Sequence, residues 1–233
     1  ETLPAAVAGL KTCGIRGFNL TMPNKNKIVE LLDELSPEAQ LIGAVNTVLN
    51  DNGKLIGYNT DGYGFMQSVR DAGHDITGKN ITVMGVGGAS MAICAQSALD
   101  GAASVHIFAR HTSRYWNRTQ KFAENLSAKT GCQVCLFDND DHTALRDSIA
   151  QSYLLINATS VGMVPDIDDT IIKDTSLFHP ELVVADVVYE PQETRLLREA
   201  KAAGCQTFNG MYMLLHQGAK AFQIWTGQEM PVS

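Results

Sequence analysis

The sequence of 233 residues contains no apolar run of the roughly 18–20 residues that a membrane-spanning helix requires. Basic residues are few and scattered, with 18 Lys and Arg against 25 Asp and Glu and a net charge of −7. A nucleic-acid-binding protein normally carries a clustered basic surface. We therefore expect neither a membrane nor a nucleic acid as a partner.

Low-complexity tracts are absent too, and only 18% of the residues are charged while 45% are hydrophobic, which excludes a disordered chain. The five cysteines are spread along the sequence and form no disulfide framework, so we expect a reducing, cytoplasmic location. Cys132 and Cys135 have C-x-x-C spacing, but no second pair follows, and their neighbours are typical of a strand. We interpret both as small apolar residues of a sheet and predict no metal site.

Strand and helix patterns alternate through the middle of the sequence. The expected strands are continuous Val, Ile and Leu runs, which is typical of parallel strands covered on both faces. A doubly wound α/β domain over residues 64–210 is therefore predicted. The expected strands cover 80–85, 103–108, 133–137, 153–157 and 182–186, and the expected helices cover 89–99, 118–129 and 143–151.

Two shorter regions flank this domain. In residues 1–63, Asn52-Gly53 is a strong hairpin signal between two β-rich runs. We expect residues 1–63 and 211–233 to form one smaller α/β domain, with the active site in the cleft between the domains. Because the chain opens on Glu1 without Met, we also expect the N-terminal part of the smaller domain to be missing. The elements expected here are strands at 17–21, 45–49 and 54–58 and helices at 25–35 and 211–225.

A glycine-rich turn links the first expected strand of the larger domain to a helix. A turn of this kind brings backbone N–H groups and the positive end of the helix against a phosphate. A plain tight turn is the alternative, but the surrounding strand–helix alternation favours a Rossmann-type dinucleotide site. The residues expected to bind the pyrophosphate are Gly85, Val86, Gly87, Gly88 and Ala89.

The end of the next strand usually distinguishes NAD from NADP, because an acidic residue there holds the ribose 2′-hydroxyl. This sequence has no acid at that point and instead carries Arg110 and Arg114. Arginine matches phosphate geometry, so NADP is the favoured cofactor. NAD stays open, since exposed arginines are common after a strand.

Two ionisable residues nearer the N-terminus are candidates for acid–base chemistry. Lys25 follows Pro23 at the expected start of a helix, where the positive helix end disfavours a cation and so suits a group that exchanges a proton. Asp61 follows an expected strand and could orient that ammonium group. A solvated lysine and an ordinary Asp-Gly turn are the plainer alternatives.

Seven short motifs, in this order between Gly14 and Pro231, resemble the shikimate/quinate 5-dehydrogenase family. The motifs are Asn19-x-Thr21-x-Pro23-x-Lys25, Gly43-Ala44-Val45-Asn46-Thr47, Asn59-Thr60-Asp61-Gly62, Gly85-x-Gly87-Gly88-Ala89, Asn157-Ala158-Thr159-Ser160-Val161-Gly162-Met163, Asp186-Val187-Val188-Tyr189-x-Pro191 and Met213-Leu214-Leu215-His216-Gln217. The resemblance implies hydride transfer between NADP(H) or NAD(H) and a ring carbon of shikimate, or of quinate.

The resemblance also implies roles for individual residues. Lys25 matches the catalytic lysine, which exchanges a proton with the substrate oxygen, and Asp61 matches its partner. The implied substrate contacts, besides these two, are Thr21, Asn46, Tyr189 and Gln217. The implied cofactor contacts are the glycine turn, Arg110 and Arg114, with Val187, Gly210 and Met213 lining the nicotinamide pocket. The expected partners are small molecules, and the expected assembly is a monomer or a homodimer.

The sequence departs from the family at two points. The serine pair that grips the substrate carboxylate has no match here, and Thr112 stands where the branch that accepts NAD has an aspartate. The alternative function is a non-catalytic sensor of a ligand or nucleotide with the same fold. The presence of both Lys25 and Asp61 argues against a sensor, which needs no proton donor.

Overall fold

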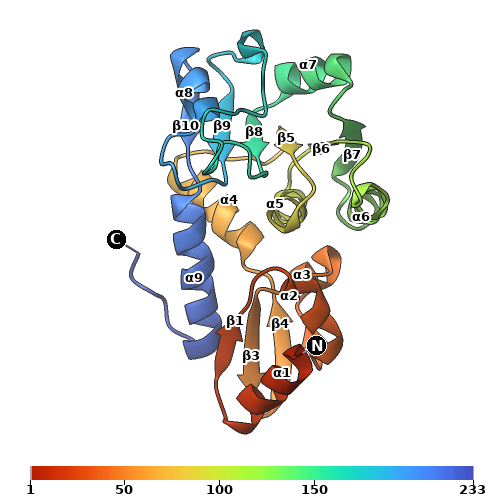
Figure 1. The fold of residues 1–233 in the computed structure, drawn as a ribbon, viewed down its shortest axis with the longest axis vertical. Coiled ribbons are helices and arrows are strands. Elements are labelled where there is room, and N and C mark those ends of the chain that lie inside the picture. Colours follow the sequence, from red (N-terminus) through yellow and green to blue (C-terminus); the bar gives the residue numbers. More distant parts are fainter. Residues whose placement is uncertain (1, 233) are drawn as a thin grey trace.

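The computed structural model describes residues 2–232, and two separate β-sheets organise them (Figure 1). The larger sheet has six strands in the order β10-β9-β8-β5-β6-β7, and all of its pairings are parallel. This confirms the predicted doubly wound α/β fold. The strands are β5 (Asn80–Met84), β6 (Ser104–Ala109), β7 (Gln133–Asp138), β8 (Leu154–Asn157), β9 (Val183–Asp186) and β10 (Gln206–Phe208).

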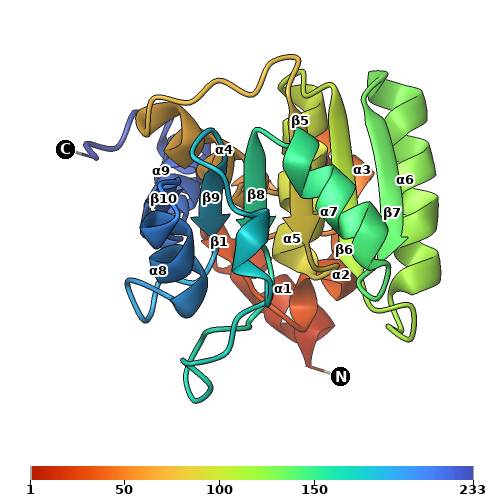
Figure 2. The same cartoon turned by 90° about the horizontal axis from the view of Figure 1, so that it is seen from above.

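Helices cover both faces of this sheet, as the unbroken apolar strands predicted (Figure 2). Alternate strand residues such as Val83 and Ile107 pack with α4 (Asp61–Asp71), α5 (Gly88–Leu99) and α6 (Trp116–Thr130). The residues between them, such as Met84 and Val184, pack against the other layer, formed by α7 (His142–Gln151) and α8 (Arg195–Ala202). Of the described helices, none is long and apolar enough to cross a bilayer.

The smaller sheet has four strands in the order β1-β3-β4-β2. The predicted hairpin is confirmed, because Asn52 and Gly53 join β3 to β4 with positive φ angles of 53° and 92°. A short helix, η2 (Thr175–Leu177), lies in the loop after β8. The elements of the smaller region are α1 (Leu3–Thr12), β1 (Gly17–Asn19), α2 (Asn24–Lys27), η1 (Ile28–Leu31), β2 (Glu34–Leu35), α3 (Pro37–Ile42), β3 (Thr47–Asp51) and β4 (Lys54–Tyr58).

The predicted helix over residues 25–35 is confirmed only as far as Leu31 and is wrong beyond it. The helix α2 ends at Lys27, the 3₁₀ helix η1 follows, and Leu32 is already extended. Asp33 explains the difference, because its backbone N–H donates to the Leu55 carbonyl at 2.9 Å and its carboxylate accepts from the Leu55 N–H at 2.7 Å. Pairing with β4 therefore overrides the helical pattern of this segment.

Two helices connect the sheets and lie against each other (Figure 1): α4 and α9 (Met211–Thr226). The far end of α9 returns to the smaller sheet, where Trp225 Nε1 donates to the Val48 carbonyl at 2.9 Å. The domain boundaries at 63/64 and 210/211 stay a prediction, since α4 runs across the first of them.

Candidate active site

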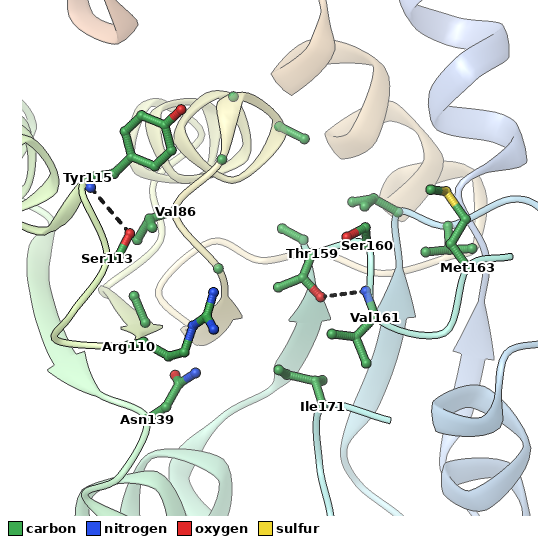
Figure 3. Close-up of a pocket in the computed structure, with 18 of the residues that line it drawn as sticks. Val86, Arg110, Ser113, Tyr115, Asn139, Thr159, Ser160, Val161, Met163 and Ile171 are labelled. Carbon is green, nitrogen blue, oxygen red and sulfur yellow. Dashed lines mark hydrogen bonds between the residues drawn. The ribbon is translucent and has the colours of Figure 1, made fainter. Parts of the chain in front are cut away.

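Two adjoining cavities lie at the carboxyl ends of the parallel strands and beside the smaller sheet. The larger has a volume of about 1230 Å³ and begins at the glycine turn after β5 (Figure 3). The smaller has a volume of about 480 Å³ and reaches Lys25 and Asp61. Both are lined by Ala89, Val187 and Tyr189, so that molecules occupying the two cavities would meet at these three residues.

The glycine turn supplies a cradle at the head of α5. Gly85 has a φ of 112°, and a Cβ atom there would lie 2.8 Å from Thr159 Cγ2, so glycine is required for this turn. A Cβ atom at Gly87 or Gly88 would meet nothing within 4 Å, because these residues face open space. Backbone approach and the helix N-terminus together fit the pyrophosphate of a dinucleotide.

Arg110 and Arg114 both line the larger cavity, after the end of β6. Arg114 donates to Tyr115 Oη at 2.6 Å, and its guanidinium lies 4.7 Å from the centre of that ring. Asn139, which follows β7, lines the same end of the cavity and was missed by the sequence analysis. Its position after the neighbouring parallel strand is the signal that could have identified it.

The opposite wall is the loop after β8, which Asn157 holds in place. Its Nδ2 donates to the Val161 carbonyl at 3.1 Å, and its Oδ1 accepts from the Thr159 N–H at 3.1 Å. The asparagine of this motif therefore shapes the cavity wall. Figure 3 shows Thr159 and Val161 facing Arg110 across the cavity.

A charged pair lies in the smaller cavity. Lys25 Nζ, from α2, is 2.6 Å from Asp61 Oδ2 on the first residue of α4. Their side chains are only 14% and 11% exposed, so little water screens the pair. Asp61 Oδ1 accepts from Asn46 Nδ2 at 2.8 Å, and Lys25, Asn46 and Asp61 all line the cavity.

Asn46 is itself held by hydrogen bonds from both sides. Its Oδ1 accepts from the Thr60 N–H and from Thr47 Oγ1, both at 2.9 Å. The structure thus brings all six residues with implied substrate roles into the lining of this cavity: Thr21, Lys25, Asn46, Asp61, Tyr189 and Gln217. Gly210 and Met213 line it as well, rather than the larger cavity.

A buried carboxyl group, that of Asp186, lies next to the residues shared by the two cavities. Asp186, at the end of β9, accepts from the Val188 N–H at 2.9 Å, Asn157 Nδ2 at 3.0 Å and Thr194 Oγ1 at 2.8 Å. Burial raises the pKa of Asp186, against the lowering effect of these three hydrogen bonds. No role for this residue follows from its motif alone, and its hydrogen bond from the Val188 N–H indicates that it fixes the segment Val187–Tyr189.

The parallel sheet, its glycine turn and the adjoining polar pocket with a lysine–aspartate pair define a dinucleotide-dependent oxidoreductase. Two family descriptions match the sequence: "Shikimate dehydrogenase substrate binding domain" over residues 1–48 and "Shikimate 5'-dehydrogenase C-terminal domain" over residues 210–233. Together with a curated relative that is 51% identical over 100% of this chain, they show that the chain belongs to the shikimate dehydrogenase family, which confirms the resemblance found in its motifs.

Relatives of known name are similar over the whole chain. Shikimate dehydrogenase (NADP(+)) of Listeria innocua is 51% identical, with 100% of this chain aligned to 79% of that protein. Quinate/shikimate dehydrogenase of Escherichia coli is 42% identical, over 100% of this chain and 80% of the relative.

Solved structures agree in fold. Shikimate 5-dehydrogenase from Listeria monocytogenes, in complex with shikimate and NAD, has a TM-score of 0.96 and 50% identity over 99% of this chain and 80% of that one. Quinate dehydrogenase from Corynebacterium glutamicum, in complex with NAD, has a TM-score of 0.87 and 33% identity over 97% and 78% of the respective chains.

Proposed function

We propose that this protein interconverts 3-dehydroshikimate and shikimate with a nicotinamide dinucleotide, and that it also acts on dehydroquinate and quinate. The observation that carries the proposal is the Lys25–Asp61 pair, in a cavity that shares a wall with the dinucleotide cradle. Membership of the shikimate dehydrogenase family supports the same reaction.

A bound nicotinamide ring supplies the hydride in one direction and accepts it in the other. The Lys25 ammonium donates a proton to the substrate carbonyl oxygen during reduction and takes it back from the hydroxyl during oxidation. Asp61 holds Nζ in place at 2.6 Å, and Asn46 fixes the other carboxylate oxygen. The pair therefore presents the proton in a defined direction.

The remaining polar residues suit a polyhydroxylated acid. Thr21, Tyr189 and Gln217 line the cavity and offer both donors and acceptors to hydroxyl and carboxylate groups. Substrate and cofactor are water-soluble small molecules, in agreement with the cytoplasmic location expected from the sequence.

For the cofactor, we propose a preference for NADP(H) with NAD(H) also accepted. Among the described residues that line the larger cavity, Glu190 is the only acidic one, and it follows β9, away from Arg110. The adenosine end therefore lacks the carboxylate that would repel a 2′-phosphate. The Listeria innocua relative is named for NADP(+), whereas the Listeria monocytogenes structure holds NAD.

A matrix of initial rates on the full-length protein tests the proposal, with shikimate and quinate each paired with NADP⁺ and NAD⁺. Lys25→Ala is expected to lower kcat by about 10²–10⁴-fold, the usual contribution of a positioned acid or base. Lys27→Ala, on the same helix but outside the cavity lining, is the matched control.

Undiminished turnover by the Lys25→Ala variant would refute the mechanism. Binding of shikimate by the wild-type protein without turnover would favour the sensor alternative instead. A strong preference for NAD⁺ would refute the interpretation of the arginines.

A further inference from the structure

We propose that the Tyr115 hydroxyl donates a hydrogen bond to the 2′-phosphate of NADP(H), beside Arg110 and Arg114, and so helps the protein to distinguish NADP(H) from NAD(H). This inference rests on the proposed cofactor preference and deepens it. The sequence motifs give Tyr115 no role, although its side chain lines the larger cavity and contacts Arg114.

Hydrogen bonds of the backbone fix Tyr115 between the end of β6 and the start of α6. Its N–H donates to Ser113 Oγ at 3.2 Å, as Figure 3 shows. Its carbonyl accepts from the Thr119 N–H and from Thr119 Oγ1, both at 2.9 Å, and Thr119 is itself buried. In a dinucleotide-binding sheet, the residues after this strand meet the ribose that carries the 2′ group. The fold therefore holds Tyr115 where that ribose is expected.

The Tyr115 hydroxyl has a proton that no described residue accepts. Arg114 Nη2 lies 2.6 Å from Tyr115 Oη. A guanidinium group contains only donors, so the tyrosine oxygen is the acceptor in this contact. The O–H of Tyr115 then points away from Arg114, and it donates to no other described residue. The hydroxyl is thus available as a donor to a group in the cavity.

The two arginines give this end of the cavity a positive charge that no carboxylate neutralises. Arg110 and Arg114 both line the cavity, and neither forms an ion pair with a described acidic residue. A phosphate monoester carries about 1.5 to 2 negative charges at pH 7, and its oxygens accept hydrogen bonds. The surroundings of Tyr115 therefore suit the 2′-phosphate of NADP(H) better than the uncharged 2′-hydroxyl of NAD(H).

The contact with Tyr115 also restricts the movement of Arg114. The guanidinium lies 4.7 Å from the centre of the tyrosine ring, so that the ring and the hydroxyl both hold it. Arg114 is exposed, and a long exposed side chain loses much rotamer freedom when it binds a ligand. Because the hydroxyl holds Arg114 beforehand, its removal is expected to cost both a donor and part of this ordering.

The pyrophosphate is the other phosphate group of the cofactor near this site. Tyr115 and Val86 of the glycine turn lie on the same side of the cavity in Figure 3. The glycine turn and the start of α5 already offer backbone N–H groups to the pyrophosphate. Tyr115 belongs instead to the loop after β6, which also carries both arginines. We therefore assign its hydroxyl to the 2′-phosphate, and a binding experiment distinguishes the two groups.

Dissociation constants for NADP⁺ and NAD⁺ test the inference without requiring turnover, because these dinucleotides differ only in the 2′-phosphate. They are measured by calorimetry on the wild type and on the Tyr115→Phe variant, which keeps the ring and lacks only the hydroxyl. The variant is expected to bind NADP⁺ about tenfold more weakly, the scale of one hydrogen bond to a charged group, and NAD⁺ unchanged. Tyr212→Phe is the matched control, because Tyr212 is an exposed tyrosine on α9 that lines neither cavity.

An unchanged dissociation constant for NAD⁺ also shows that the Tyr115→Phe variant is folded. Equal weakening of NADP⁺ and NAD⁺ would assign the hydroxyl to the pyrophosphate, and unchanged binding of both would exclude the hydroxyl from cofactor binding. Either result overturns the inference. A wild-type protein that binds NAD⁺ more tightly than NADP⁺ would refute the cofactor preference itself, and one that binds neither dinucleotide would refute the proposed function.

Discussion

Lys25 occupies a position that its own helix does not favour. It is the second residue of α2, where the positive end of a helix repels a cation. Asp61 compensates, because it lies 2.6 Å away and is itself the first residue of α4, where a carboxylate is favoured. The unfavourable placement that marked Lys25 in the sequence is thus stabilised by a residue 36 positions away.

Asp186 allows a prediction about pH at the scale of one residue. Because burial raises its pKa, the folded protein holds this proton more tightly than the unfolded chain does. The contribution of Asp186 to the unfolding free energy is therefore complete below its ordinary pKa of about 3.8 and is lost as the pH rises through the raised value. The Asp186→Asn variant, which mimics the protonated acid, is expected not to lose this part of the unfolding free energy as the pH rises.

Urea denaturation of the wild type and of the Asp186→Asn variant, from pH 3.5 to 8, measures the effect. The stability of the variant relative to the wild type should increase with pH and then level off. Asp166→Asn, on an exposed loop, should follow the wild type throughout. A constant difference between the Asp186→Asn variant and the wild type would contradict the prediction.

The helix α4 positions the site because two of its first residues are glycines. A Cβ atom at Gly62 would collide with the Ala92 carbonyl of α5. A Cβ atom at Gly64 would lie 2.7 Å from both the Met213 carbonyl and the Gln217 N–H nitrogen of α9. The absence of side chains lets both helices approach the turn that carries Asp61.

Gly64→Ala tests whether this approach sets the width of the substrate pocket. The added methyl group is expected to push α9 away, which costs about 1–3 kcal/mol of stability and moves Gln217 from Asp61. The KM for shikimate should rise roughly tenfold or more, because small displacements of positioned groups are costly. The dissociation constant of NADP⁺ should stay unchanged.

Gly218→Ala is the control on α9 itself, since a Cβ atom there meets nothing within 4 Å. Its stability should rise by up to about 1 kcal/mol from helix propensity alone, with no change in KM. Equal KM values in the wild type and the Gly64→Ala variant would show that the close contact does not govern substrate binding.

Elements with a strong local pattern were predictable from the sequence. The strands β5 to β9 and the helix α5 agree within about two residues with the structure, because their apolar runs are continuous, whereas the short edge strand β10 was not predicted. The segment 25–35 was not predictable, since its course depends on Asp33 pairing with Leu55. Asn139 and Asp186 were missed for the same reason, because their positions follow from the strands and loops that the fold places beside them.

At the scale of the whole molecule, the site exists only where the two sheets meet. The smaller region contributes Lys25 and Asn46, α4 contributes Asp61, and α9 contributes Gln217. The dinucleotide cradle belongs to the larger sheet alone. The motifs identified these residues separately, but only the fold explains how residues so distant in sequence line one cavity.

Global stability should also depend on two half-buried histidines outside the site. His106 Nδ1 lies 2.9 Å from Ser148 Oγ, and His74 Nδ1 lies 2.8 Å from Tyr153 Oη. Burial lowers the pKa of both imidazoles, so that both stay neutral in the folded protein at pH values where the unfolded chain is already protonated. Their contribution to stability is present above about pH 6.5 and is lost as the pH falls through the lowered values.

Chemical denaturation between pH 7.5 and 5 measures this loss. Carboxylates of lowered pKa, such as Asp33, titrate below this range and therefore do not contribute to the change. On acidification the stability of His106→Gln relative to the wild type is expected to rise steadily, because glutamine takes up no proton, whereas Asp186 contributes the same opposite change to both proteins. His142→Gln, which changes an exposed histidine at the start of α7, should retain the slope of the wild type. The slope is the decisive measurement, since His106→Gln also changes packing at every pH. Identical slopes in all three proteins would mean that protonation of His106 does not drive acid unfolding.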